Sequence, residues 1–356
     1  MGNFCLLKTI GLPFLKKVKS LGKGGGSGEG KPSKEGFPSP VQAFSRSLAM
    51  RNPVPRIAAI HDMSGFGRTS LTVAIPILSC MGIQVCPMPT AVLSTHTVEF
   101  TDYTLCDLTP ELGGILDHWE RLGLHFDGVY SGLASPEQMD SAARCIRNCL
   151  APGGLAVVDP VLGDNGILDP TMTPEMVEKM RWLISCADII TPNITEVALL
   201  LDEPFTPRIS PEEIKGRLRR LSAMGPQTVV ATSVPLLEGG RDPGQNTSVI
   251  AYERDEDRFW RIDCAYIPAH YPGTGDTFSS VLTGSLIQGD SLSIALDRAV
   301  QFVTLGIRAT FGQGLPSREG ILLERILGSL FAPVSTCKCR IMDGDGCCNP
   351  VLPFED

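Results

Sequence analysis

Short apolar runs alternate with longer amphipathic segments through most of this 356-residue chain. The runs predict strands at Arg56–Ile60, Ile83–Met88, Gly128–Gly132, Leu155–Asp159, Asp188–Thr191 and Thr228–Ser233. The segments between them predict helices at Ser70–Met81, Thr109–Leu122, Pro136–Leu150, Pro174–Ser185 and Pro211–Met224. Strands and helices in alternation build β-α-β units, in which helices cover both faces of a parallel sheet. We therefore expect an α/β protein.

The alternation is interrupted once, at Thr247–Cys264, where two apolar runs flank a charged turn and predict an antiparallel hairpin. The rest is predicted to be helical, at Gly275–Gln288, Ser291–Thr310 and Ser317–Leu330. We expect a three-layer αβα sandwich with a mostly parallel central sheet, formed by residues 54–332. Residues 1–53, rich in Gly and Lys, and residues 333–356, rich in Cys, are predicted to be disordered extensions.

Charge and cysteine usage restrict the partners and the compartment. The net charge is −8, and because residues 1–50 contain eight basic and two acidic residues, the remainder carries −14. An acidic body argues against nucleic acid as a partner. The twelve cysteines have no disulfide or zinc spacing, and no apolar run reaches the roughly 18 residues that a membrane span needs. We expect free thiols, no membrane span and a cytoplasmic location.

Polar residues gather after the predicted strands, where open parallel sheets bind ligands. These candidates are Asp62 and Ser64, His96 and Thr97, Asp159, Asn193 and Glu196, and Thr232 and Ser233. The glycines Gly65 and Gly67 follow the first strand, but Ser70 stands where a dinucleotide fingerprint has its third glycine. A tight strand-to-helix turn is favoured over a dinucleotide site, and a small-molecule pocket beside Asp62 and Ser64 is the third interpretation.

The segment Pro272–Phe278, with the sequence PGTGDTF, is the most informative motif. Glycines before a helix leave backbone N–H groups free to face an anion, and the helix dipole favours negative charge there. Asp276 could be a simple capping charge, but a cap does not need both Gly273 and Gly275. An anion-binding turn beside a carboxylate suits the transfer of a phosphoryl group to an alcohol, with Asp276 accepting the hydroxyl proton.

These motifs also carry a family resemblance. The segments GTGD, DPVLGDNG, PNITE and AVLSTHT, which lie between Arg56 and about Thr310, resemble the ribokinase-like superfamily. Together they are most similar to the pyridoxal/pyridoxamine (vitamin B6) kinases, and to the related kinases of the thiamin pyrimidine. The resemblance implies a ribokinase-like fold, ATP and Mg²⁺ as cofactors, a B6 vitamer as substrate and a homodimer. It leaves a K⁺ requirement open.

The resemblance also implies a role for each candidate. Asp276 would be the catalytic base, with Gly273, Thr274 and Gly275 as the anion hole. Asn193 and Glu196 match the N-x-x-E that positions Mg²⁺, partly through water, and Asp159 matches an acidic residue of the phosphate and metal region. Thr232 and Ser233 match ATP contacts, and His96 and Thr97 match the vitamer pocket. From the residues alone, Asn193 and Glu196 indicate a turn and an exposed helix residue, and His96 indicates a structural histidine.

The chain departs from the family pattern at Asp62. Many B6 kinases have Gln-Ser-His after the first strand, with the serine touching the pyridine ring, whereas this chain has His61-Asp62-Met63. We therefore expect Asp62 to influence which ring is accepted. The expected activity is phosphorylation of the 5′-hydroxymethyl group of pyridoxamine or pyridoxal. The alternatives are a hydroxymethylpyrimidine kinase, a non-catalytic vitamer-binding protein and an NAD-dependent enzyme.

Overall fold

A computed structural model describes residues 53–132, 134–237, 246–265, 267–333, 338–342 and 348–349. The chain divides into two compact units, Met1–Arg51 and Asn52–Asp356. The first unit lies outside the described residues, and so do residues 1–52 of the predicted N-terminal extension. Everything below concerns the second unit.

A mostly parallel sheet forms the centre of this unit, in the order β13-β12-β11-β10-β9-β8-β5-β4-β1-β2-β3. Its strands are β1 (Arg56–Phe66), β2 (Gln84–Thr95), β3 (Leu105–Asp107), β4 (Phe126–Ser131), β5 (Leu150–Val158), β8 (Ile189–Ile190), β9 (Thr228–Val234), β10 (Asn246–Glu253), β11 (Arg258–Ala265), β12 (Arg340–Met342) and β13 (Cys348–Asn349). The six strands from β9 to β2 are parallel, and the hairpin β10–β11 is antiparallel, as predicted. A small separate hairpin pairs β6 (Gly163–Asp164) with β7 (Ile167–Leu168).

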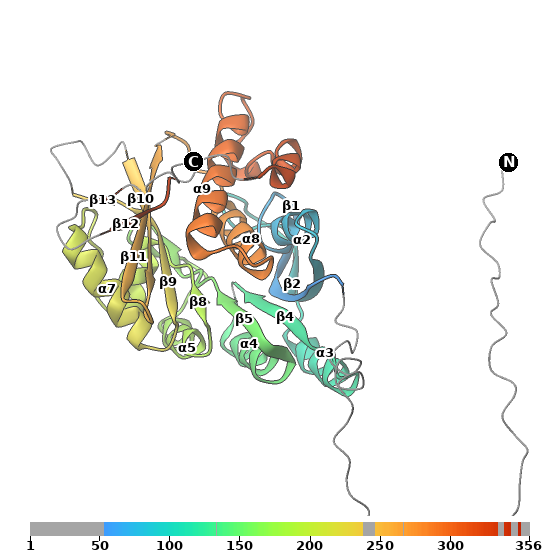
Figure 1. Ribbon diagram of the computed structural model, residues 1–356. Coiled ribbons are helices and arrows are strands. Elements are labelled where there is room, and N and C mark those ends of the chain that lie inside the picture. The colour runs from blue at the N-terminus through green and yellow to red at the C-terminus, as the bar shows by residue number, and fades with distance from the viewer. Residues whose placement is uncertain are drawn as a thin grey trace, which may run out of the picture. The chain divides into compact units, whose positions relative to one another are not determined.

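Helices cover both faces of the sheet (Figure 1). One face carries α3 (Thr109–Arg121), α4 (Pro136–Cys149), α5 (Pro174–Ile184), α6 (Ile194–Leu201) and α7 (Pro211–Ala223), and the other carries α2 (Leu71–Cys80), α8 (Thr274–Ile287) and α9 (Leu292–Thr310). Side chains of one strand alternate between the two apolar cores: in β5, Ala156 and Val158 join the first and Val157 joins the second. Burial on both faces explains why the parallel strands are continuous apolar runs.

The fold confirms the predicted three-layer α/β architecture, with three corrections. The first two strands are longer than predicted, because β1 and β2 keep pairing as far as Phe66 and Thr95. The predicted helix at Ser317–Leu330 is wrong. The structure has three 3₁₀ helices there, η2 (Ser317–Glu319), η3 (Leu323–Arg325) and η4 (Leu327–Phe331). Gly320 has a φ of 78°, which a right-handed helix cannot contain.

The third correction concerns the C-terminal extension. Residues Arg340–Met342 form β12, which pairs with β11, so disorder is the wrong prediction for this part of residues 333–356. The domain boundary at residue 332 remains a prediction. Among the residues that the structure describes, no helix has the length and apolar character needed to cross a membrane.

Gln138 joins three elements on the first face. The backbone N–H of Ser135, the N-cap of α4, donates to Gln138 Oε1 (2.8 Å), and Ser135 Oγ accepts the Gln138 N–H (3.4 Å). The Gln138 side-chain amide also donates to the Thr90 carbonyl of β2 (3.1 Å) and to Thr109 Oγ1 of α3 (2.7 Å). Removing this buried amide costs stability, because the Ser135 N–H loses its side-chain acceptor and the link from α4 to β2 and α3 is lost.

Replacing Gln138 with alanine should lower the free energy of unfolding by about 1–2 kcal/mol, since it removes the reciprocal half of the capping box and the side-chain hydrogen bonds to β2 and α3. The matched control is Arg147→Ala, an exposed position of the same helix, which should change it by less than about 0.5 kcal/mol. Urea unfolding followed by circular dichroism measures both. Equal midpoints for the two variants would contradict this role of Gln138.

Candidate active site

The predicted site residues meet at the carboxyl edge of the parallel strands. Asp62 and Ser64 lie in β1, His96 and Thr97 follow β2, Asp159 follows β5, Asn193 and Glu196 begin α6 just after β8, Thr232 and Ser233 end β9, and Gly273–Asp276 begin α8. The structure therefore brings segments far apart in the sequence to one edge. The reason is the parallel pairing, which points the ends of β1, β5, β8 and β9 in one direction.

The turn before α8 has the backbone expected of an anion site. Gly273 has a φ of 78°, and a Cβ at this position would lie 2.0 Å from the Arg68 carbonyl oxygen. Glycine is thus needed here for both conformation and space. The Thr274 hydroxyl donates to the Tyr271 carbonyl (3.0 Å), and Gly275 is exposed. The first N–H groups of a helix lack intrahelical partners, so this turn presents donors toward the sheet edge.

Asp276 lies in the first turn of α8, but its carboxylate is held from another element. The backbone N–H of Ser70, at the start of α2, donates to Asp276 Oδ2 (2.9 Å). Burial raises the pKa of Asp276 to about 7, and the charges of Asp159 and Asp62 add to the rise, while the Ser70 hydrogen bond opposes it. A carboxylate with a pKa near neutrality suits a general base, because it is ionised at working pH and still basic enough to take a proton.

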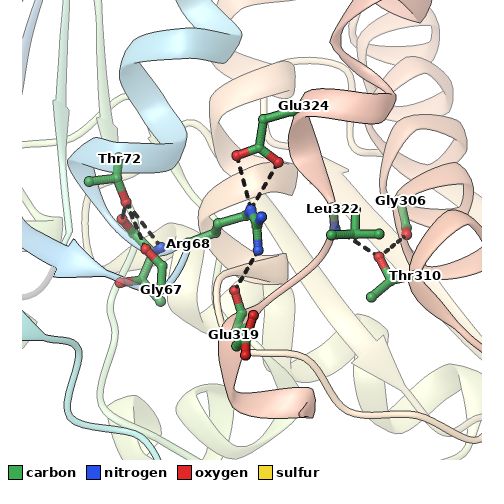
Figure 2. Close-up of polar contacts among 9 residues, drawn as sticks. Gly67, Arg68, Thr72, Gly306, Thr310, Glu319, Leu322 and Glu324 are labelled. Carbon is green, nitrogen blue, oxygen red and sulfur yellow. Dashed lines mark hydrogen bonds and ion pairs between the residues drawn. The ribbon is translucent and has the colours of Figure 1, made fainter. Parts of the chain in front are cut away.

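Arg68, in the turn between β1 and α2, is bonded to the 3₁₀ segment (Figure 2). Its carbonyl oxygen is the atom that excludes a side chain at Gly273. Its Nε donates to both Glu324 oxygens (3.1 and 3.0 Å), and Nη1 donates to the Glu319 carbonyl (3.0 Å). Figure 2 also shows Thr310 of α9, whose hydroxyl accepts a backbone N–H from the same segment (2.8 Å). Residues Ser317–Arg325 are thereby tied both to the end of β1 and to α9.

Asp62 is buried and both of its carboxylate oxygens have protein partners. Ser70 Oγ donates to Asp62 Oδ1 (2.6 Å), and Ser64 Oγ donates to Asp62 Oδ2 (3.2 Å). Thr69 donates in turn to the Ser64 hydroxyl (3.1 Å). Burial raises the Asp62 pKa, and the two serine hydrogen bonds oppose the rise. The structure thus gives Asp62 an internal hydrogen-bonding role, which the sequence prediction of a ring contact did not include.

Asn193 and Glu196 form a reciprocal cap at the start of α6. Asn193 Oδ1 accepts the N–H groups of Thr195 (2.8 Å) and Glu196 (3.0 Å), and the Asn193 N–H donates to Glu196 Oε2 (2.7 Å). Glu196 Oε1 accepts the Leu162 N–H (3.1 Å). Glu196 is 4% exposed, so the interpretation of an exposed helix residue is wrong. The cap explains why this motif requires its two polar residues at this spacing.

Asp159 and Glu196 are two buried carboxylates at the carboxyl edge of the sheet that could bind a metal ion. Burial raises the pKa of Asp159 to about 6, and burial together with the Asp159 charge raises that of Glu196 well above its usual range. Across the described part of the chain, no group of three or more His, Cys, Asp or Glu side chains could hold a metal ion. Mg²⁺ commonly takes one or two carboxylates with phosphate oxygens and water. Asp159 and Glu196 therefore suit a cation such as Mg²⁺ that is completed by phosphate oxygens and water. They do not suit a metal ion whose ligands all come from the protein.

His96 has partners for both ring nitrogens. Nε2 lies 2.6 Å from the Arg318 carbonyl, and Nδ1 accepts the Val98 N–H (3.2 Å), which places the proton on Nε2. Burial lowers the His96 pKa, in keeping with a neutral ring. A Cβ at Gly67, which has a φ of 93°, would lie 2.3 Å from this ring. His96 therefore fixes the Gly67 turn to the 3₁₀ segment, and Gly67 belongs to a tight strand-to-helix turn.

The remaining candidates lie at strand ends. Thr232 and Ser233 are at least partly exposed at the end of β9, where Ser233 has a φ of 55° and the Thr232 N–H donates to the Pro192 carbonyl (2.9 Å). Thr97 is half-buried just after β2. Contacts of Thr232 and Ser233 with ATP, and of His96 and Thr97 with a vitamer, remain predictions.

Sequence reasoning missed Ser70 and Ser279 as parts of the site. Ser279 Oγ of α8 donates to Asp159 Oδ2 (3.1 Å) and lies 2.9 Å from Thr191 Oγ1. No local motif marks this contact, because it joins residues 120 positions apart. Ser70 did have a signal: it occupies the place of a third glycine, and its φ of 52° is glycine-like.

Comparison with known proteins agrees with this geometry. Residues 126–319 match the family model described as phosphomethylpyrimidine kinase. A crystal structure from Bacteroides thetaiotaomicron, of a candidate phosphomethylpyrimidine kinase with pyridoxal, is 53% identical, with a TM-score of 0.77 over 81% of this chain and 99% of that one.

Curated relatives of two kinds are more distant. A pyridoxal kinase of Burkholderia lata is 26% identical over 72% of this chain and 88% of its own length. A hydroxymethylpyrimidine/phosphomethylpyrimidine kinase of Mycobacterium bovis is 24% identical over 73% of this chain and 90% of its own. Family chemistry implies ATP and a divalent metal ion. Together with the αβα fold and the site at its carboxyl edge, these matches show that the chain belongs to the phosphomethylpyrimidine kinase family of the ribokinase-like superfamily, which includes the vitamin B6 kinases.

Proposed function

We propose that the chain transfers the γ-phosphoryl group of ATP to the 5′-hydroxymethyl group of pyridoxamine or pyridoxal, with Mg²⁺ as the metal ion. The observation that carries this proposal is Asp276, a part-buried carboxylate with a pKa of about 7 beside the glycine turn of α8. The 53% identical relative that was crystallised with pyridoxal supports a B6 vitamer as the substrate.

In the proposed reaction, Asp276 accepts the proton of the substrate hydroxyl as its oxygen attacks the γ-phosphorus. The N–H groups of Gly273, Thr274 and Gly275 stabilise the charge on the transferring group, because they are already oriented at the helix N-terminus. ATP would lie along Asn193, Thr232 and Ser233. The vitamer would lie on the β1–β2 side, beyond Ser64 and Thr97.

Asp159 and Glu196 would hold Mg²⁺, with Glu196 acting through water because both of its oxygens accept backbone N–H groups. When bound, Mg²⁺ neutralises phosphate charge. The requirement for K⁺, the homodimer and the cytoplasmic location remain predictions. Exposed apolar side chains on β1, β2 and β3 support the homodimer; they are Met63, Phe66, Val92 and Leu105.

A hydroxymethylpyrimidine kinase is the second candidate. It is favoured by the description of the matching family model and by the mycobacterial relative. The chemistry is the same, because both substrates present a hydroxymethyl group on a nitrogen heterocycle. The non-catalytic alternative has less support. A buried carboxylate with a raised pKa beside an anion-binding turn lowers stability, and such groups are typical of catalytic sites.

Asp276→Asn should lower kcat about 10²–10⁴-fold, because the amide cannot accept the hydroxyl proton. ATP binding, measured by isothermal titration with the Mg²⁺ complex, should change little. The matched control is Asp140→Asn, an exposed carboxylate of α4 that pairs with Lys179 and should leave kcat unchanged. Turnover of Asp276→Asn within threefold of wild type would exclude Asp276 as the base.

The pH dependence of kcat/KM follows from the same carboxylate. Burial raises the Asp276 pKa from its usual value of 3.8 to about 7, so the ionised base is lost as pH falls through that value. The rate should decrease by about tenfold for each pH unit below about 7 and level off above it. Initial rates across this range test the expectation, and a profile that is flat down to about pH 5 would contradict it.

Substrate preference separates the two candidates. For a B6 kinase, kcat/KM for pyridoxamine or pyridoxal should exceed that for hydroxymethylpyrimidine by at least about tenfold, the order of discrimination that a few ring contacts supply. A coupled assay of ADP release with the three alcohols measures this ratio. The reverse order of preference would favour the pyrimidine kinase.

A further inference from the structure

Ser70 lies between two carboxylates of the site in a conformation that is unusual for its residue type. It is the N-cap of α2, with φ 52° and ψ −128°, a region that glycine enters readily and residues with a Cβ rarely do. Outliers of this kind persist where the surrounding structure holds them, and they cluster at functional sites. The contacts of Ser70 show what holds it and what its position achieves.

Three groups of contacts hold Ser70. Its hydroxyl donates to Asp62 Oδ1 (2.6 Å), and its carbonyl accepts the N–H groups of Val73 (3.0 Å) and Ala74 (2.9 Å), which begin α2. Its own N–H then donates to Asp276 Oδ2 (2.9 Å). The direction of a backbone N–H depends on the conformation of its residue. The positive φ and the hydrogen bond to Asp276 are therefore one structural feature.

The Asp62 carboxylate is held in position to accept the hydrogen bond from the Ser70 hydroxyl. It is 9% exposed, and its second oxygen accepts Ser64, which in turn accepts Thr69. The carboxylate is thus fixed from both sides within β1 and the turn that follows. Asp62 is also close enough to Asp276 for its charge to raise the pKa of that carboxylate.

We propose that Asp62 and Ser70 are positioning residues for Asp276. Asp62 anchors the Ser70 hydroxyl, the anchor keeps Ser70 at positive φ, and the Ser70 N–H then fixes one oxygen of Asp276 and leaves the other for the substrate hydroxyl. The kinetic part of this inference rests on the proposed function. It gives Asp62 a task other than ring recognition, because each of its oxygens accepts a hydroxyl from within the protein.

Two substitutions of Ser70 separate the roles of its hydroxyl and of its conformation. Ser70→Ala and Ser70→Gly both remove the hydroxyl, but glycine adopts positive φ freely whereas alanine does not. Ser70→Ala should lower kcat about 10–100-fold with KM within threefold, the scale of loss for a misplaced catalytic group. Ser70→Gly should stay within about threefold of wild type. Equal kcat values for the two variants, whether both high or both low, would falsify the proposal.

Asp62 offers an independent pair of variants. Asp62→Asn keeps an oxygen that can accept the Ser70 hydroxyl, so kcat should stay within about threefold of wild type. Asp62→Ala removes the anchor and should lower kcat as Ser70→Ala does, by the same factor for pyridoxamine, pyridoxal and hydroxymethylpyrimidine. If Asp62 instead contacts the ring, both variants raise KM by factors that differ among the three alcohols, and the inference is overturned.

A structural measurement keeps the inference separate from the proposed function. Crystal structures of the full chain should show the distance from the residue-70 nitrogen to Asp276 Oδ2 preserved in Ser70→Gly and lost in Ser70→Ala. Wild-type protein that phosphorylates none of the three alcohols would defeat the proposed function, while these structures still decide the positioning role. A preserved distance in Ser70→Ala, in folded protein, overturns that role whatever the activity.

Discussion

Parallel pairing of the central strands is the constraint on which the rest of this structure depends. Strands β1, β4, β5, β8 and β9 run in one direction, so every segment that leaves their carboxyl ends begins at the same edge. Because both faces are covered by helices, the strands can carry few polar side chains until they reach that edge. Chemistry is thereby confined to the strand ends and to the helix that faces them, α8.

The burial of several carboxylates at this edge of the sheet also determines their pKa values. Burial raises the pKa values of Asp62, Asp159, Glu196 and Asp276 together, and for Glu196 and Asp276 neighbouring carboxylates add to the effect. Most of the opposing contributions are hydrogen bonds from serine or threonine hydroxyls and from backbone N–H groups. Such an edge favours a cation between the carboxylates and any phosphate, which fits the divalent metal that the family's chemistry implies.

Much of the fold followed from local patterns. Apolar runs and helix-period segments located the parallel strands and most helices, because burial on two faces leaves a clear signal in each element. The error at Ser317–Leu330 arose because helix periodicity is imitated by consecutive 3₁₀ turns. Gly320 interrupts them with a positive φ at a place where a Cβ would lie only 3.1 Å from Arg68. The strand β12 was missed since three residues carry too little pattern and are held by their pairing with β11.

By itself, the sequence determined the three-layer class, the glycine turn before α8 and the presence of a carboxylate there, because each depends on residues adjacent in the chain. The tertiary structure decided what the individual polar groups do. Glu196 is a buried member of a helix cap, His96 links two segments, and Asp62 accepts the Ser70 hydroxyl. The physical reason is that a hydrogen bond is satisfied by whichever partner the fold brings within about 3 Å. Ser70 and Asp276 are 206 positions apart, and only the folded sheet edge makes them neighbours.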